Sequence, residues 1–85
     1  MKEKIIDFVM VVSGFEGEKE ELLGTLTSNL ELDSLEKVSY VVMLEEEYNI
    51  FISDEDIEEI DYEHTVQELV ESTIILLKRK VEEWK

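Results

Sequence analysis

Leu32-Asp33-Ser34-Leu35-Glu36 is the stretch around which the chain is organised, because it predicts the start of a helix. Asp33 suits the N-cap position, where a carboxylate accepts a hydrogen bond from an unpaired N–H group of the first turn. Glu36 can accept in return from the Asp33 N–H, as in a capping box. Ser34 then takes the first helical position, where free N–H groups and the helix dipole would stabilise a phosphate on its hydroxyl. An ordinary helix start has the same pattern, so this stretch alone leaves both interpretations open.

The helix that follows, predicted over residues 34–48, has two apolar faces. At about 100° per residue, the expected core face gathers Tyr40, Val41, Leu44 and Tyr48. A second apolar stripe lies on nearly the opposite side, within an arc of roughly 60°. This docking stripe consists of Leu35, Val38 and Val42, and it is framed by Glu36, Glu45 and Glu46. Because a small surface helix needs only one buried face, the stripe predicts a surface for a partner, unless the helix is buried on both sides.

The positions around the serine also form a longer pattern. It comprises Asp33-Ser34-Leu35, Val38, Val41, the run from Leu44 to Tyr48, Ile50, Ile52, the run from Asp54 to Asp56, Ile60 and Thr65-Val66. This pattern resembles that of the acyl carrier proteins over most of the chain from Leu30 to about Ile74. The resemblance implies that Ser34, flanked by Asp33 and Leu35, carries 4′-phosphopantetheine as a phosphodiester. The thiol of that arm would hold an acyl group as a thioester.

The resemblance also implies partners and a binding pocket. The partners would be a phosphopantetheinyl transferase and acyl-transferring or synthase enzymes with basic docking surfaces, in a fatty-acid, polyketide or specialised acyl pathway. Four apolar positions match those near the family's acyl pocket: Leu44, Ile52, Ile60 and Val66. The chain would then be a carrier that presents a tethered substrate, and not an enzyme.

The chain departs from the family pattern at five places. Glu31 stands where a glycine is common, Ser39 where an acidic residue is usual, and Ser53 where a proline is common. Lys37 adds a positive charge near the start of the recognition helix, and the link from residue 60 to residue 66 is longer than usual. These departures leave the attachment site in place and bear on which synthases recognise the carrier.

Composition favours one small helical domain with protein partners. The chain has 85 residues, no proline, three glycines and a net charge of −15. This negative charge argues against nucleic acid and anionic membranes as ligands, because both are negatively charged themselves. Repulsion between copies of the chain favours a monomer. No segment is long and apolar enough to span a membrane, and Asp7 interrupts the apolar run of a possible signal peptide, so we expect a cytoplasmic protein.

The residues predict neither a catalytic site nor a metal site. The absence of cysteine excludes disulfides and thiolate ligands, so a thiol would have to arrive on a prosthetic group. His64 has no serine at a suggestive spacing and is expected in a surface loop. Asp54, Asp56 and Glu58 loosely resemble a calcium loop, but Glu59 replaces its required glycine. The alternative to a carrier is an acidic helical interaction module without a prosthetic group.

The predicted fold is all-α, a small four-helix bundle with a long first loop, formed as one domain by residues 1–85. The three longer helices are expected over residues 2–13, over residues 34–48 and from Val66, where an apolar stripe runs to Val81. A short helix is expected over residues 54–60, with Ser53 as its cap. Trp84 either closes the core or stays exposed. The loop over residues 14–32 is expected to be pinned to the core by Leu22, Leu23, Leu26 and Leu30.

Overall fold

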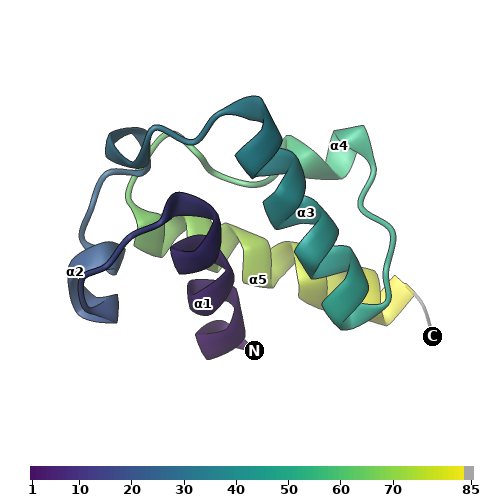
Figure 1. Ribbon diagram of the computed structural model, residues 1–85. Helices are drawn as coiled ribbons and strands as arrows, with labels where there is room; N and C mark the ends of the chain where they lie inside the picture. Colours follow the sequence, from purple (N-terminus) through teal and green to yellow (C-terminus); the bar gives the residue numbers. More distant parts are fainter. Residues whose placement is uncertain (84–85) are drawn as a thin grey trace.

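The computed structural model describes residues 1–83 and is all-α, as predicted (Figure 1). The elements in chain order are α1 (Lys2–Ser13), α2 (Lys19–Leu23), the 3₁₀ helix η1 (Thr27–Leu30), α3 (Ser34–Tyr48), α4 (Asp54–Ile57) and α5 (Val66–Glu83). Within residues 1–83 there is no strand, and no helix combines the length and the apolar character that crossing a bilayer requires. Trp84 lies outside the described residues.

The core forms where α1, α3 and α5 bury their apolar faces. α1 packs against both α3 and α5, and α2 packs against α5 (Figure 1). On α3 the predicted core face is confirmed, because Tyr40, Val41 and Leu44 are buried and Tyr48 is half-buried. The apolar stripe of α5 is buried at Val66, Leu69, Val70 and Leu77. Val81, at the end of that stripe, is 38% exposed, so the stripe leaves the core before the last turn of α5.

A buried hydrogen bond joins the two helices on either side of this core. The Tyr40 hydroxyl on α3 lies 2.8 Å from Thr73 Oγ1 on α5. Thr73 Oγ1 also donates to the Leu69 carbonyl oxygen. Both hydroxyl groups have hydrogen-bond partners, so burying them does not incur the free-energy cost of burying an unpaired polar group.

Local signals fix where the longer helices end. Gly14 closes α1 with a φ of 70°, a left-handed conformation that glycine adopts without steric cost. Asn49 ends α3 in the same region, with a φ of 51°. Asn tolerates this conformation better than most residues, which explains why α3 ends where the sequence predicts.

The long first connection is held by backbone hydrogen bonds to the link before α5. The Thr27 N–H donates to the His64 carbonyl oxygen at 2.8 Å, and the Val66 N–H donates to the Thr25 carbonyl oxygen at 2.9 Å. Leu22 is fully buried, as predicted, but Leu26 is 50% exposed. The prediction for Leu26 is wrong because its backbone, bridged to Thr65, anchors the loop and leaves the side chain in solvent.

The short helix ends earlier than predicted, at Ile57 instead of residue 60. Ser53 and Asp56 form the expected capping box. The Glu59 and Ile60 N–H groups then bond to carbonyl oxygens three residues earlier, which tightens the chain into turns. Ile60 is nevertheless buried, so these turns place it in the core without a helix.

Candidate functional site

The first turn of α3 has the capped geometry that the sequence predicts. Asp33 Oδ1 accepts from the Glu36 N–H at 2.8 Å, and Glu36 Oε1 accepts from the Asp33 N–H at 3.2 Å. Ser34 is the first residue of the helix, and it is exposed. An exposed hydroxyl at the positive end of a 15-residue helix fits a phosphodiester, because the N–H groups of the first turn have no partners within the helix.

The docking stripe faces solvent. Leu35 is 77% exposed, Val38 is 58% exposed and Val42 is 40% exposed. This confirms that the stripe lies outside the core, although its use as a docking surface stays a prediction. Folding does not explain three exposed apolar residues in line on one helix, whereas burial against a partner would.

The apolar surface continues from the stripe onto α1. A groove of about 480 Å³ runs between the two helices, lined by Val11 and Val12 of α1 and by Glu36, Val38, Ser39, Val42 and Met43 of α3. Val11 is itself 67% exposed. The sequence analysis did not find this extension, because it depends on how α1 crosses α3.

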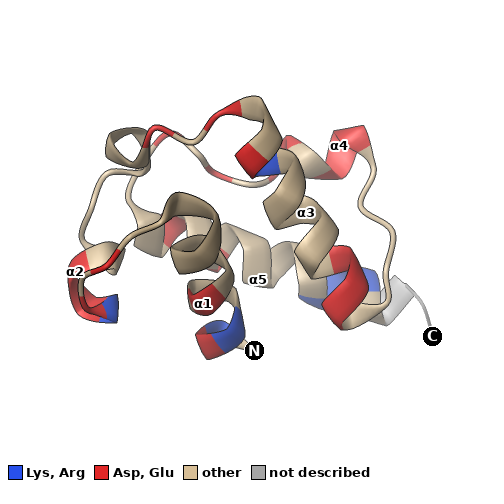
Figure 2. Cartoon of the chain, viewed as in Figure 1, with Lys and Arg blue, Asp and Glu red and all other residues tan. Residues whose placement is uncertain are grey.

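The carboxylates that frame the stripe differ in their surroundings. Glu46 is exposed, whereas Glu36 closes the capping box and Glu45 Oε2 accepts from the Ile52 N–H at 2.8 Å. Two of the three therefore also hold local backbone in place. Figure 2 shows acidic residues over the second half of α3 and over α4.

The four predicted acyl-pocket residues all lie in the core. Leu44, Ile52, Ile60 and Val66 are each at most 4% exposed. Beside Ile60, a surface hollow of about 680 Å³ is lined by Lys37 and by residues 57–64. The structure therefore brings the four residues into one apolar cluster, with a hollow open to solvent next to one of them.

Comparison with family models, with curated proteins and with solved structures found no match to this chain. The site is therefore interpreted from its own residues and their geometry.

Four of the departures from the resembled family have structural consequences. Glu31 has a φ of 51°, in the left-handed region where glycine is favoured. The Lys37 ammonium lies 5.0 Å from the centre of the Tyr62 ring, within the range of a cation–π interaction. Ser39 is exposed and lines the groove between α1 and α3. The longer link, from residue 60 to residue 66, contains Tyr62, the residue whose ring the Lys37 ammonium contacts.

The buried carboxylate of Asp56 joins α4 to α5 through ion pairs that the sequence analysis did not predict. Asp56 accepts from Arg79 Nη2 at 2.8 Å and pairs with Lys80, and Arg79 also bonds both Glu59 oxygens. Burial opposes the ionisation of Asp56, but the hydrogen bonds from Lys80 and Ser53 outweigh it and lower its pKa to about 2. No spacing rule in the sequence connects partners so far apart along the chain.

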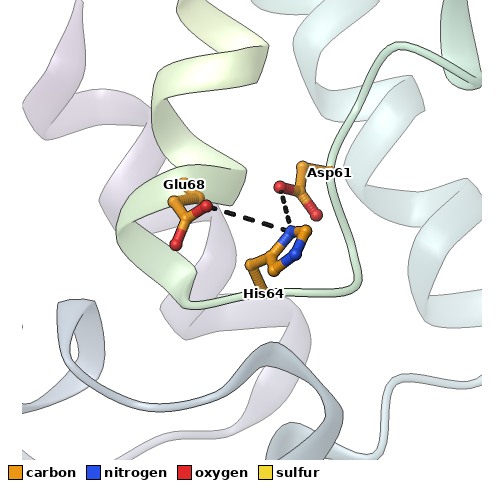
Figure 3. Close-up of side chains that lie close together, drawn as sticks. All are labelled: Asp61, His64 and Glu68. Atoms are coloured by element: carbon orange, nitrogen blue, oxygen red, sulfur yellow. Dashed lines mark hydrogen bonds and ion pairs between the residues drawn. The ribbon is translucent and has the colours of Figure 1, made fainter.

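Asp61, His64 and Glu68 converge at the start of α5 (Figure 3). Asp61 Oδ2 lies 2.7 Å from His64 Nδ1, and Glu68 Oε2 lies 3.9 Å from the same nitrogen. The hydrogen bond to Asp61 raises the pKa of His64, and the same bond lowers the pKa of Asp61. The three donor atoms lie within 4.8 Å of one another, which is the kind of cluster that can hold a cation. His64 is exposed, as predicted, and its hydrogen bond to Asp61 already gives Nδ1 a partner.

Proposed function

We propose that the protein is an acyl carrier protein in which Ser34 carries 4′-phosphopantetheine. The observation that carries the proposal is the exposed Ser34 at the capped start of α3, directly before an exposed apolar stripe with acidic flanks. When attached, the group supplies a thiol that holds an acyl chain as a thioester. The chain's own residues would position the serine and present it to partner enzymes.

The arrangement of helices supports the proposal. In our interpretation α1, α3 and α5 are the three longer helices of a four-helix bundle, and α4 is the short one. α2 and η1 then belong to the long connection between the first two bundle helices. This is the arrangement that the resemblance to acyl carrier proteins implies.

The docking stripe is the proposed contact surface for partner enzymes. A phosphopantetheinyl transferase and acyl-transferring or synthase enzymes would bury Leu35, Val38 and Val42 and face the acidic flanks with basic residues. Exposed charge pairs add little affinity each, so Glu36, Glu45 and Glu46 would act mainly by steering and orienting the encounter. With a net charge of −15, we propose a monomer that serves a fatty-acid, polyketide or specialised acyl pathway in the cytoplasm.

The acyl chain is proposed to enter the apolar cluster of Leu44, Ile52, Ile60 and Val66. Each methylene buried there would contribute roughly 0.8 kcal/mol. Because these residues are packed in the core, the helices must separate to admit a chain, and the burial of the chain has to offset that cost.

The test is attachment of phosphopantetheine from coenzyme A, measured by intact-protein mass spectrometry with a phosphopantetheinyl transferase. Ser34→Ala should abolish the mass increase and leave the melting temperature unchanged, because the Ser34 side chain is exposed. Ser39→Ala is the matched control, since Ser39 is also exposed on α3, and it should load normally. No loading of the wild type would favour the acidic interaction module without a prosthetic group. Loading that persists in Ser34→Ala would place the modification elsewhere.

A further inference from the structure

Tyr62, in the link between α4 and α5, buries its hydroxyl without a hydrogen-bond partner. Within residues 1–83, no donor or acceptor lies within bonding distance of Tyr62 Oη. The Tyr40 hydroxyl provides the contrast, because it is buried and bonded to Thr73 Oγ1 at 2.8 Å. A buried hydroxyl without a partner lowers stability, so its presence requires an explanation.

The tyrosine lies next to Lys37 of α3 and lines a hollow beside the core residue Ile60. Its ring is under the Lys37 ammonium, and Lys37 is one turn along α3 from Ser34. Tyr62 and Ile60 line the same hollow, whose volume of about 680 Å³ is within the range of small-molecule sites. Ile60 is also one of the four proposed acyl-pocket residues. We expect a chain that runs from Ser34 toward Ile60 to pass through this hollow, beside Tyr62.

The chemistry of the hydroxyl limits what can satisfy it. Burial raises the pKa of Tyr62 to about 12, so the group is a neutral O–H donor over the physiological range. A saturated hydrocarbon chain offers it no acceptor. A keto oxygen or a hydroxyl on the chain accepts its hydrogen bond, and a hydroxyl can also donate to it.

We propose that Tyr62 selects acyl chains bearing an oxygen substituent, a hydroxyl or keto group, through a hydrogen bond from its buried hydroxyl. The inference rests on the proposed carrier function and specifies its substrate class. A saturated chain leaves the Tyr62 hydroxyl unpaired, whereas a chain with a hydroxyl or keto group forms a hydrogen bond with it. Because an unpaired buried polar group is costly, the second chain should bind more favourably than the first.

The test compares matched chains on the wild type and on Tyr62→Phe, which removes only the hydroxyl. Octanoyl, β-hydroxyoctanoyl and β-ketooctanoyl groups are attached to Ser34 from their coenzyme A thioesters, and loading is confirmed by mass spectrometry before each thermal melt. In the wild type, an oxygenated chain should raise the melting temperature by about 4 °C or more beyond the octanoyl chain. In Tyr62→Phe this difference should vanish.

Two controls separate the hydroxyl from general effects. Tyr48→Phe removes the hydroxyl of a half-buried tyrosine at the other end of α3 and should keep the discrimination. Unloaded Tyr62→Phe should melt no lower than the wild type, because it loses an unpaired group. A lower value would mean that the hydroxyl is bonded in the free protein, and it would overturn the inference.

The remaining outcomes distinguish this inference from the carrier function itself. A chain that loads but shows equal melting temperatures for all three groups would refute selection by Tyr62 and leave the carrier function standing. A difference in melting temperature between oxygenated and octanoyl chains that persists in Tyr62→Phe would likewise refute selection by Tyr62 and leave the carrier function standing. If Ser34 does not load at all, the carrier function fails and the inference fails with it.

Discussion

Replacing Asp56 by Asn tests whether the ion pairs between α4 and α5 stabilise the fold. The Asp56 side chain is only 9% exposed, and it faces both Arg79 and Lys80. An asparagine side-chain oxygen can still accept from the Ser53 N–H, as Asp56 Oδ2 does at 3.0 Å, so the helix cap can survive. The substitution therefore removes the charge while keeping the shape and the cap.

The size of the effect follows from the pKa of Asp56. Burial opposes its ionisation, but hydrogen bonds from Lys80 and Ser53 outweigh this and lower the pKa from the ordinary 3.8 to about 2. At about 1.4 kcal/mol per pKa unit, ionised Asp56 contributes roughly 2 to 3 kcal/mol to the free energy of unfolding at neutral pH. Because the pKa is lowered on folding, this contribution is complete above pH ~4 and lost as the pH falls toward ~2.

Thermal melts of Asp56→Asn and the wild type, followed by circular dichroism, measure this contribution. At neutral pH the variant should melt roughly 10 °C lower, since 1 kcal/mol shifts the midpoint of a domain this size by about 4–8 °C. The gap should close as the pH falls from about 4 to about 2. Other carboxylates titrate in both proteins, so the difference between the two curves isolates Asp56.

Asp54→Asn is the matched control, because it removes one negative charge from an exposed position in the same helix. Its melting temperature should stay close to that of the wild type at each pH. Equal melting temperatures of Asp56→Asn and the wild type at neutral pH would refute the stabilising role of the ion pairs. A gap that persists unchanged at the lowest pH would refute the assignment to ionisation, and would point to lost packing instead.

Three further predictions concern the partner surface and the backbone before α3. Val38→Asp should slow loading by a phosphopantetheinyl transferase without changing the melting temperature, while Ile75→Asp, on exposed α5 surface, should load normally. Normal loading of Val38→Asp would show that the docking stripe is not the contact surface for the transferase. The on-rate of the transferase for the wild type should fall steeply as salt is added, because the screening length is only about 3 Å at 1 M. Glu31→Gly should raise the free energy of unfolding by up to about 1 kcal/mol, since relief of the left-handed strain exceeds the entropy cost of glycine. Glu31→Ala, which removes the charge and keeps the strain, should not show this gain, and an equal gain in both variants would assign the effect to charge.

The sequence predicts α3 almost completely because the signals for its ends are local. Asp33 and Glu36 lie within one turn of each other, and Asn49 ends the helix through its own backbone preference. The two faces of the helix follow from periodicity, which also operates over a few residues. Such features do not depend on how distant elements pack, so the exposure of the docking stripe could be predicted from the chain alone.

The contacts that the sequence did not predict join residues far apart along the chain. Asp56 and Arg79 meet because α4 lies against α5, and no periodicity encodes that meeting. The same holds for Tyr40 and Thr73 on facing helices. The sequence places Tyr62 in the link between residues 60 and 66. Whether its hydroxyl is buried depends on how that link packs against the core, which the sequence does not predict. The candidate site is thus predictable at Ser34 and the first turn of α3, and less so around Tyr62.

Lys37 illustrates how the fold accommodates a charge that the family pattern lacks. At about 100° per residue, Lys37 falls on the side of α3 that carries Tyr40 and Leu44, and not on the side of the docking stripe. There its ammonium lies over the Tyr62 ring, at the edge of the core. The positive charge is therefore held toward the link between α4 and α5, and the acidic frame of the stripe stays uninterrupted. A lysine that would oppose basic partners on one face of the helix instead lines, on the other face, the hollow beside Ile60.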